Sequence, residues 1–219
     1  MILSNLITAK VNLLAGIVLG ISFCIIHNKV REKWGICKQE RVIISVANLI
    51  PVKGIEVLIK AFELIVHDYS EWKLMIVGRV TTEYGKKLKK KILENSKIKH
   101  KIIFTGIQSK VKELLDISEI YVQPSLNPGE GSPISVLEAM SNGKVIIGSD
   151  VPGIRDQLNE FSDHLFNPGD ALQLKEKLIK FISQDINYNK EIGKKFVDHV
   201  FKHYDLKIES ELLKKYYLR

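Results

Sequence analysis

Five short apolar runs recur along the chain, and stretches with apolar residues at helical spacing separate them. The runs span residues 42–46, 74–77, 102–104, 120–122 and 145–147. Their alternation with amphipathic helices predicts an α/β fold, in which a doubly wound parallel sheet is covered on both faces. Ligands of such sheets bind in the crevice beyond the carboxyl ends of the strands. The chain has 219 residues, 45% of them hydrophobic, which suffices for one sizeable core.

The stretch from residue 124 to residue 143, PSLNPGEGSPISVLEAMSNG, sets two glutamates eight positions apart across a Gly-Ser-Pro turn. If a helix begins near Pro133, Glu130 lies in the loop before it and Glu138 lies in its second turn. Ionised carboxylates accept hydrogen bonds from the paired hydroxyls of a sugar or a ribose. Backbone N–H groups at the helix start, around Gly131 and Ser132, can bind phosphate or hydroxyl oxygens. Taken alone, the pattern also fits two ordinary surface charges.

Residues 42–69 predict a strand, a turn that holds Lys53 and Gly54, and a helix that packs on the sheet. The apolar residues of its packing face are Ile55, Leu58, Ile59, Phe62, Ile65 and Val66. Lys53 thus stands at a helix N-terminus, where the helix dipole and unpaired N–H groups favour an anion such as pyrophosphate. The alternative is a solvated lysine at the tip of a loop.

Six motifs stand in the order, and at nearly the spacing, of one enzyme family: VANLIPVKGIEVLIKAFELI, LMIVG, IIFTG, EIYVQPS, EGSPISVLEAMSNGKVIIGSDVPGI and LFNPGD. From residue 17 to residue 184 the chain resembles the donor-binding half of family 4 glycosyltransferases, also called glycosyl transferases group 1. The resemblance implies the Rossmann-like carboxyl-terminal domain of the two-domain GT-B fold. It also implies a retaining hexosyltransferase that uses a nucleotide diphosphate sugar, without metal or cofactor, in the synthesis of a polysaccharide or glycoconjugate.

By this resemblance, the two glutamates and the lysine hold different parts of the donor. Glu138 matches the glutamate that holds the ribose hydroxyls, and Glu130 matches the one that faces the hydroxyls of the sugar. Lys53 matches the lysine at the diphosphate, so Glu130 and Lys53 are the predicted catalytic residues. The other predicted donor-binding residues lie in the same turns and at strand ends: Asn48, Gly54, Gly78, Arg79, Gly106, Gly131, Ser132, Pro133 and Ile134.

The chain departs from the family pattern in two places. Many members carry an arginine where this chain has Asn48, and losing that charge weakens the hold on the diphosphate unless Arg79 or another basic group replaces it. The commoner Phe-Gly after the first glutamate is replaced by Ser132 and Pro133. A tight turn is still permitted, because proline is tolerated at the first position of a helix.

A complete enzyme of this family carries an acceptor-binding domain of similar size ahead of the donor-binding domain. We expect residues 1–40 to form a residual linker or apolar segment, residues 41–185 the donor-binding domain, and residues 186–219 two further helices. Acceptor binding then falls to a separate domain or subunit. The alternative is a non-enzymatic or truncated nucleotide-sugar-binding subunit. The apolar stripes of the two helices are Ile192, Phe196, Val200 and Phe201, and Leu206, Leu212, Leu213 and Tyr216.

Residues 11–26, VNLLAGIVLGISFCII, form an apolar run that is followed by Lys29, Arg31 and Lys33. A membrane-spanning helix needs about 20 apolar residues, so the run is short for a span. No positive region precedes it, which argues against a secretory signal. The run also resembles the family's interdomain stretch, in which a Gly-Ile pair leads into a strand that here ends in IIHN. We expect this linker strand rather than a membrane span.

The formal net charge is +8, and residues 86–101 hold eight lysines against one glutamate. Tyr84, Leu88 and Ile92 lie on the opposite face of the helix predicted there. The lysines fit a solvated outer face, or attachment of an enzyme or a basic scaffold to an anionic membrane surface. No nucleic-acid-binding motif accompanies the charge, so no nucleic acid partner is expected.

Other chemistries find little support in the sequence. Two cysteines are too few for a disulfide framework, and they fit a cytoplasmic protein, including one peripheral at the inner membrane face. The six histidines show no metal-ligand spacing, so no metal site is expected, and each is interpreted as a surface or packing residue. No phosphate-binding loop of the GxxxxGK type occurs, which disfavours a kinase or an ATPase.

Overall fold

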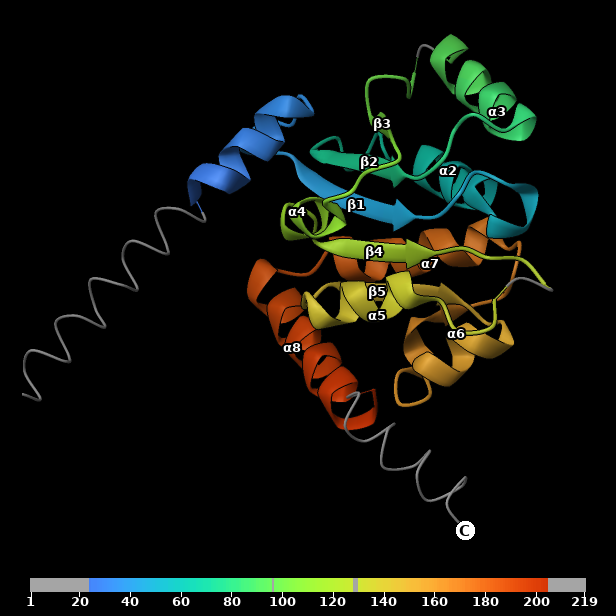
Figure 1. Ribbon diagram of the computed structural model, residues 1–219. Helices are drawn as coiled ribbons and strands as arrows, with labels where there is room; N and C mark the ends of the chain where they lie inside the picture. The colour runs from blue at the N-terminus through green and yellow to red at the C-terminus, as the bar shows by residue number, and fades with distance from the viewer. Residues whose placement is uncertain (1–23, 96, 128–129, 205–219) are drawn as a thin grey trace, which may run out of the picture. The chain divides into compact units, whose positions relative to one another are not determined.

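The computed structural model describes residues 24–95, 97–127 and 130–204. In this part of the chain, six parallel strands form one sheet in the order β3-β2-β1-β4-β5-β6 (Figure 1). The strands are β1 (Arg41–Val46), β2 (Trp72–Val77), β3 (Ile102–Gly106), β4 (Ile120–Gln123), β5 (Val145–Ser149) and β6 (Leu165–Phe166). The predicted doubly wound, Rossmann-like parallel sheet is confirmed, and each apolar run lies in a strand. β6 was not predicted, because two residues leave no periodic signal.

Helices connect the strands and cover both faces of the sheet. Within the described residues they are α2 (Ile55–Glu63), α3 (Glu83–Glu94), α4 (Val111–Asp116), α5 (Ile134–Ser141), α6 (Pro152–Gln157), α7 (Ala171–Ile182) and α8 (Ile186–His203), with short 3-10 helices η1 (Pro51–Lys53) and η2 (Ser162–His164). Side chains cap several of them. Thr82 accepts a hydrogen bond from Gly85 at the start of α3, and Asp170 and Asp185 cap α7 and α8 in the same way.

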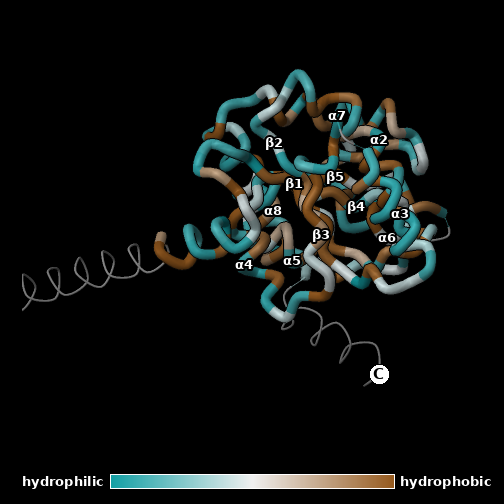
Figure 2. The backbone as a smooth tube through the Cα atoms, turned by 90° about the horizontal axis from the view of Figure 1, so that it is seen from above, coloured by the Kyte–Doolittle hydropathy of each residue, from teal (hydrophilic) through white to brown (hydrophobic). Residues whose placement is uncertain are grey.

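Successive residues of each strand point to opposite faces of the sheet. Ile43 and its register partners Leu74 and Ile120 belong to a core cluster shared with α2, α3 and α7. On the other face, α5 packs against β4 and α8 packs against β5. Figure 2 shows the apolar colour along the strands and hydrophilic colour over the outer loops and helices. Burial on both faces explains why the strands form nearly continuous apolar runs.

The predicted packing faces hold for α2 and in part for α8. All six residues predicted to face the sheet around α2 are buried, although α2 ends at Glu63 and the last two lie beyond it. In α8, Phe196 is buried, but Phe201 is 63% exposed, so its place in the apolar stripe is wrong. A helix turns about 100° per residue, and five steps carry Phe201 off the buried side. The second predicted stripe, residues 206–216, lies outside the described residues.

The chain divides into two compact units, residues 1–39 and 40–219. In the first unit, residues 24–33 are helical, so the predicted strand ending in IIHN is wrong. A helix satisfies its own backbone hydrogen bonds, whereas a strand needs a paired neighbour. Most of the apolar run at residues 11–26 lies outside the described residues. Among the residues described, no helix combines the length and the apolar character that a membrane crossing requires.

Candidate functional site

The strand order reverses between β1 and β4, which are hydrogen-bonded neighbours. From β1 the chain runs on to α2, which packs on one face of the sheet, and from β4 it runs on to α5 on the other face. Two loops that diverge in this way leave a crevice at the carboxyl ends of the strands. Lys53, the last residue of η1, follows β1, and Glu130 follows β4. The fold therefore brings these two predicted site residues to the same edge of the sheet.

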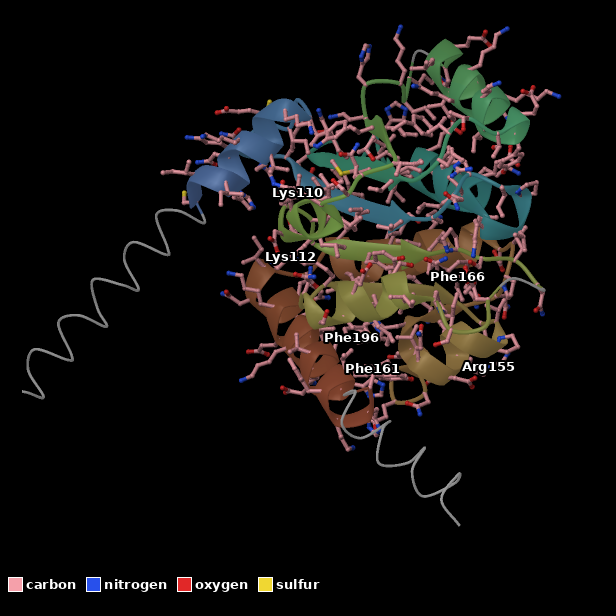
Figure 3. All side chains as sticks on the ribbon, viewed as in Figure 1. Lys110, Lys112, Arg155, Phe161, Phe166 and Phe196 are labelled. Atoms are coloured by element: carbon pink, nitrogen blue, oxygen red, sulfur yellow. The ribbon has the colours of Figure 1, made fainter. Side chains whose placement is uncertain are left out.

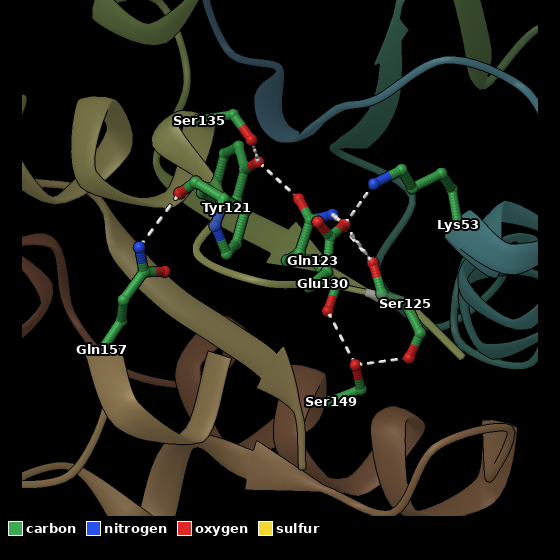
Figure 4. Close-up of polar contacts among 9 residues, drawn as sticks. Lys53, Tyr121, Gln123, Ser125, Glu130, Ser135, Ser149 and Gln157 are labelled. Atoms are coloured by element: carbon green, nitrogen blue, oxygen red, sulfur yellow. Dashed lines mark hydrogen bonds and ion pairs between the residues drawn. The ribbon is translucent and has the colours of Figure 1, made fainter. Parts of the chain in front are cut away.

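Lys53 and Glu130 form an ion pair across this crevice (Figure 4). The Lys53 Nζ lies 2.6 Å from Glu130 Oε1, although the two residues are 77 positions apart in the chain. The Glu130 side chain is 8% exposed and that of Lys53 is 22% exposed. Partial burial makes this contact stronger than an ion pair at an open surface.

Polar side chains on β4 and directly after it form hydrogen bonds that support Glu130. Gln123 Nε2 and the Ser125 hydroxyl donate to Glu130 Oε1 at 2.9 and 2.7 Å. The Tyr121 phenol donates in turn to Gln123 Oε1 at 2.7 Å. Sequence reasoning missed these three residues. Their signal is the alternation at positions 121, 123 and 125, which places all three on one face of β4 and its extension.

Close backbone packing holds the two loops together. Gly54 has a φ of 62°, and a Cβ atom there would overlap the carbonyl oxygen of Pro124 in the loop after β4. The Leu126 N–H donates to the Val52 carbonyl at 2.7 Å, which ties the same two loops once more. Glycine at position 54 is therefore required both by its left-handed conformation and by this close approach.

The turn between Glu130 and α5 is fixed from the side of α6. A Cβ atom at Gly153 would overlap the carbonyl oxygen of Gly131, and Gln157 Nε2 donates to the Ser132 hydroxyl at 3.0 Å. The helix predicted near Pro133 is α5, which begins at Ile134 with Pro133 as its N-cap. Proline thus lies one residue before the first helical position. Gly131, Ser132 and Ile134 are exposed beside the N-terminal turn of α5.

Beside this crevice, a hollow of about 330 Å³ lies between the ends of β1 and β2 and the loop after β3. Asn48, Gly78 and Arg79, all predicted site residues, line it, and the Arg79 N–H donates to Asn48 Oδ1 at 3.3 Å. Ile107 and Gln108 also line it and were not predicted; they directly follow the predicted residue Gly106. Ile107 is 66% exposed and offers an apolar surface.

Glu138 lies on α5, one helical turn after Ser135, and is exposed. The Ser135 hydroxyl lies 2.9 Å from the Tyr121 phenol. Burial raises the pKa of Tyr121, and the carboxylates of Glu130 and Glu138 raise it further, against the hydrogen bond with Ser135. Both glutamates therefore act on the same phenol, from the two sides of the turn that joins β4 to α5.

One group of described side chains has the composition of a metal site: Glu160, His199 and His203. None of the three was predicted as a site residue. The prediction that the histidines lack metal-ligand spacing is wrong for His199 and His203, which are four residues apart on α8. Glu160 precedes η2 and could not be paired with them from sequence spacing.

The family model described as "Glycosyl transferases group 1" matches residues 27–196. N-acetyl-alpha-D-glucosaminyl L-malate synthase of Bacillus anthracis is 27% identical over 177 residues, which cover 80% of this chain and 45% of that protein. An uncharacterized glycosyltransferase of Haemophilus influenzae is 32% identical over 129 residues, covering 58% of this chain and 35% of that one.

Among solved structures, Anabaena HepE in complex with UDP-glucose is similar, with a TM-score of 0.75 at 19% identity. The superposition covers 87% of this chain and 52% of that one. A likeness at this identity concerns the fold. The chain spans about half, or less, of the length of these relatives.

Proposed function

Because the chain belongs to the glycosyl transferases group 1 family, we propose that it is the donor-binding half of a retaining hexosyltransferase. It would move a hexose from a nucleotide diphosphate sugar to an acceptor, in the synthesis of a polysaccharide or glycoconjugate. The observation that carries this proposal is the Lys53–Glu130 pair, which sets a cation and a carboxylate side by side at the strand-order reversal.

Lys53 would bind the diphosphate while it keeps its ion pair with Glu130. An ammonium group has three N–H donors, and the ion pair with Glu130 uses one of them. The N-terminal turn of α5 adds unpaired backbone N–H groups and the positive end of its dipole. Two positive elements on either side of the crevice suit a pyrophosphate, which carries its charge on both phosphates.

The two glutamates would then hold the two sugars of the donor. All three hydrogen bonds to Glu130 from Lys53, Gln123 and Ser125 use Oε1, which leaves Oε2 to accept from hydroxyls of the transferred sugar. Glu138, exposed on α5, would accept from the ribose hydroxyls. The base would enter the hollow beside Asn48 and Arg79, with Ile107 against its apolar face.

In the transition state the bond between the anomeric carbon and the diphosphate breaks, so negative charge grows on the leaving oxygen and positive charge on the sugar. Lys53 and the α5 N-terminus stabilise the first charge, and the fixed carboxylate of Glu130 stabilises the second. The acceptor would attack from the face that the diphosphate leaves, which retains the anomeric configuration.

Acceptor binding would require a separate domain or subunit, because the relatives are about twice as long as the stretch they share with this chain. Residues 41–185 would be the donor-binding domain, residues 186–219 its carboxyl-terminal helices, and residues 1–40 a linker or apolar segment. The protein would work in the cytoplasm, and relatives named as glycosyltransferases make a non-enzymatic subunit the weaker alternative.

Separating the roles of the glutamates tests the proposal. Calorimetric titration would compare a nucleoside diphosphate with its hexose derivative in two variants. Glu138→Ala should lower the affinity for both ligands alike, by about tenfold, because one hydrogen bond to a charged group is lost. Glu130→Ala should leave the affinity for the nucleoside diphosphate unchanged. It should remove the additional affinity for the hexose derivative and slow sugar transfer to an acceptor. Equal effects of the two variants on both ligands would contradict the assignment.

The lysine-rich outer face of α3 supports a membrane contact for the same enzyme. Leu88 and Ile92 are buried as predicted, while Lys86, Lys89 and Lys90 border a hollow of about 560 Å³ with an apolar lining. Lysines around such a hollow suit anionic lipid headgroups. Co-sedimentation with phosphatidylglycerol vesicles should be lost when these lysines are changed to glutamine; binding that ignores the acidic lipid content would contradict the contact.

A further inference from the structure

Glu160, His199 and His203 meet where the last turn of α8 passes the loop between α6 and η2. His203 Nε2 lies 3.1 Å from Glu160 Oε1, and His199 Nδ1 lies 3.4 Å from Glu160 Oε2. All the candidate ligand atoms lie within 4.8 Å of one another. Ligands about 2 Å from a tetrahedral ion are about 3.3 Å apart, so the distances from the Glu160 oxygens to the two imidazoles match those of a zinc site.

The hydrogen bonding of His199 determines which of its ring nitrogens presents a lone pair to Glu160. His199 is 4% exposed, and its Nε2 lies 3.1 Å from the carbonyl oxygen of Gln157, which can accept but not donate. Nε2 therefore carries the hydrogen, and in the neutral ring Nδ1 presents a lone pair. Among the described residues Nδ1 has no hydrogen-bond partner, although it faces a carboxylate oxygen of Glu160. Two acceptors face each other, and a positive charge between them would satisfy both.

We propose that His199 Nδ1, His203 Nε2 and the Glu160 carboxylate bind one divalent metal ion of the zinc class. Two imidazoles and a carboxylate are the ligand set that Zn²⁺ accepts, with water in a fourth position. The Gln157 carbonyl, by accepting from His199 Nε2, fixes the ring orientation, as outer-shell acceptors do in metal sites. This site lies on residues that the proposed sugar transfer does not use.

Aromatic packing holds the ligands in place before any ion arrives. Phe161, next to Glu160, packs on Phe196 of α8 with ring centroids 4.3 Å apart, and its ring meets His199 edge-on at 5.2 Å (Figure 3). The Phe161 contacts thus hold His199 beside Glu160, and they do not depend on the metal.

Lys202 is the group that competes with the ion. Its Nζ lies 3.5 Å from Glu160 Oε1, but its side chain is 68% exposed and can turn into solvent. A bound ion would displace it at little cost, since an exposed ion pair contributes about 0–1 kcal/mol. Replacing Lys202 by glutamine should therefore leave metal binding intact or tighten it.

Titration of the full-length, tag-free chain with Zn²⁺, and with Co²⁺ as a coloured probe, tests the site. The wild type should bind one equivalent, and the cobalt complex should show the intense visible absorption of a tetrahedral centre. Glu160→Gln and His203→Asn should each weaken binding by more than the about 10- to 100-fold that loss of an outer-shell partner costs. His67→Asn, at an exposed histidine outside the cluster, is the matched control and should bind as the wild type does.

A thermal melt adds a second readout. Zn²⁺ should raise the melting temperature of the wild type and of His67→Asn, but not of Glu160→Gln or His203→Asn, because an ion that binds the native state stabilises it. Both ligand changes lie at partly exposed side chains, where folding should survive. A wild type without saturable binding at one equivalent, or ligand variants that bind as tightly as the wild type, would overturn the proposal.

Discussion

The crevice at Lys53 and Glu130 and the hollow beside it form the two ends of the candidate site, and they are built differently. At the strand-order reversal, Lys53 and Glu130 are paired, Gln123 and Ser125 support the carboxylate, and Gly54 brings the two loops into backbone contact. The hollow beside Asn48 is open, and an exposed isoleucine borders it. At the ordered end the polar side chains bond one another, and the open end offers space and surface.

The difference indicates a division of work along the donor. Groups that meet charge in a transition state must be held in place beforehand, since reorganisation during the reaction raises the barrier. A base that only anchors the substrate can be bound by apolar contact and loosely placed polar groups. Under the proposed function, the ordered end would hold the diphosphate and the transferred sugar, and the open end would hold the nucleoside.

The largest effect is expected at the backbone contact of the ordered end. Gly54→Ala adds a Cβ atom that overlaps the Pro124 carbonyl and strains a left-handed φ, so stability should fall by about 3 kcal/mol or more. Gly106→Ala is the matched control, because φ is 70° there and no atom lies within 4 Å of the added Cβ. It should cost about 1 kcal/mol in urea denaturation. Equal losses would show that the loops are not held by this contact.

The next effect separates the ion pair from its surroundings. Lys53→Met leaves a nearly buried carboxylate without its cation and should destabilise the fold by about 2 kcal/mol. Glu130→Gln removes the charge from the other side. The double variant should lose about 1 kcal/mol less than the sum of the single losses, as measured by urea denaturation. Additive losses would mean that Lys53 and Glu130 do not stabilise each other.

Acidification should destabilise the fold through His164, a buried residue outside the crevice. Burial lowers the pKa of His164 from 6.5 to about 4, and its Nδ1 bonds the Ile146 carbonyl of β5 at 2.6 Å. Because the unfolded chain binds more protons between these values, His164 stabilises the fold fully above about pH 6.5 and ceases to do so as the pH falls toward about 4. Going from about pH 7 to about pH 5 should cost about 2 kcal/mol.

His164→Asn keeps a hydrogen-bond donor near β5 and removes the titrating ring. Its stability, whatever its absolute value, should lose most of this dependence on pH. Denaturation of both proteins at each pH gives the comparison. If the stability of the variant depended on pH as steeply as that of the wild type, a group other than His164 would be responsible.

The smallest effect is expected at the open end. Ile107→Ala should leave stability within about 0.5 kcal/mol, because the side chain is 66% exposed. Removing its apolar contact with a base should lower nucleotide affinity by about threefold to tenfold. Leu172→Ala, at a residue of α7 that is 62% exposed, is the control and should change neither quantity. An unchanged nucleotide affinity of Ile107→Ala would show that the base does not bind in this hollow.

The sheet could be predicted because strands that are buried between helices consist of apolar runs, as β1 to β5 do. β6 could not, since two residues carry no period, and the strand predicted near residues 25–28 was wrong because the same residues form a helix. Phe201 was placed on the buried side, although it lies five residues beyond Phe196, about 140° around the helix. Local pattern thus predicts elements well where they are long and fully buried.

The site could be predicted at its motifs but not at its support. Lys53 and Glu130 were expected at one crevice, yet their direct pairing depends on β1 and β4 being neighbours, which no local pattern reveals. Gln123 and Ser125 stand at the end of an apolar strand and look unremarkable until its face is known. The cluster of Glu160 with His199 and His203 also needs tertiary contact, because 39 positions separate Glu160 from the nearer histidine.

Calorimetric titration of the whole chain with UDP-, GDP- and ADP-hexoses tests most directly whether the ordered crevice holds an activated sugar. The account predicts that one of them binds with a single equivalent and that Lys53→Ala weakens it by about tenfold or more, because a charged contact to the diphosphate is lost. Saturable binding that survives Lys53→Ala unchanged, or no binding of any of the three, would contradict it.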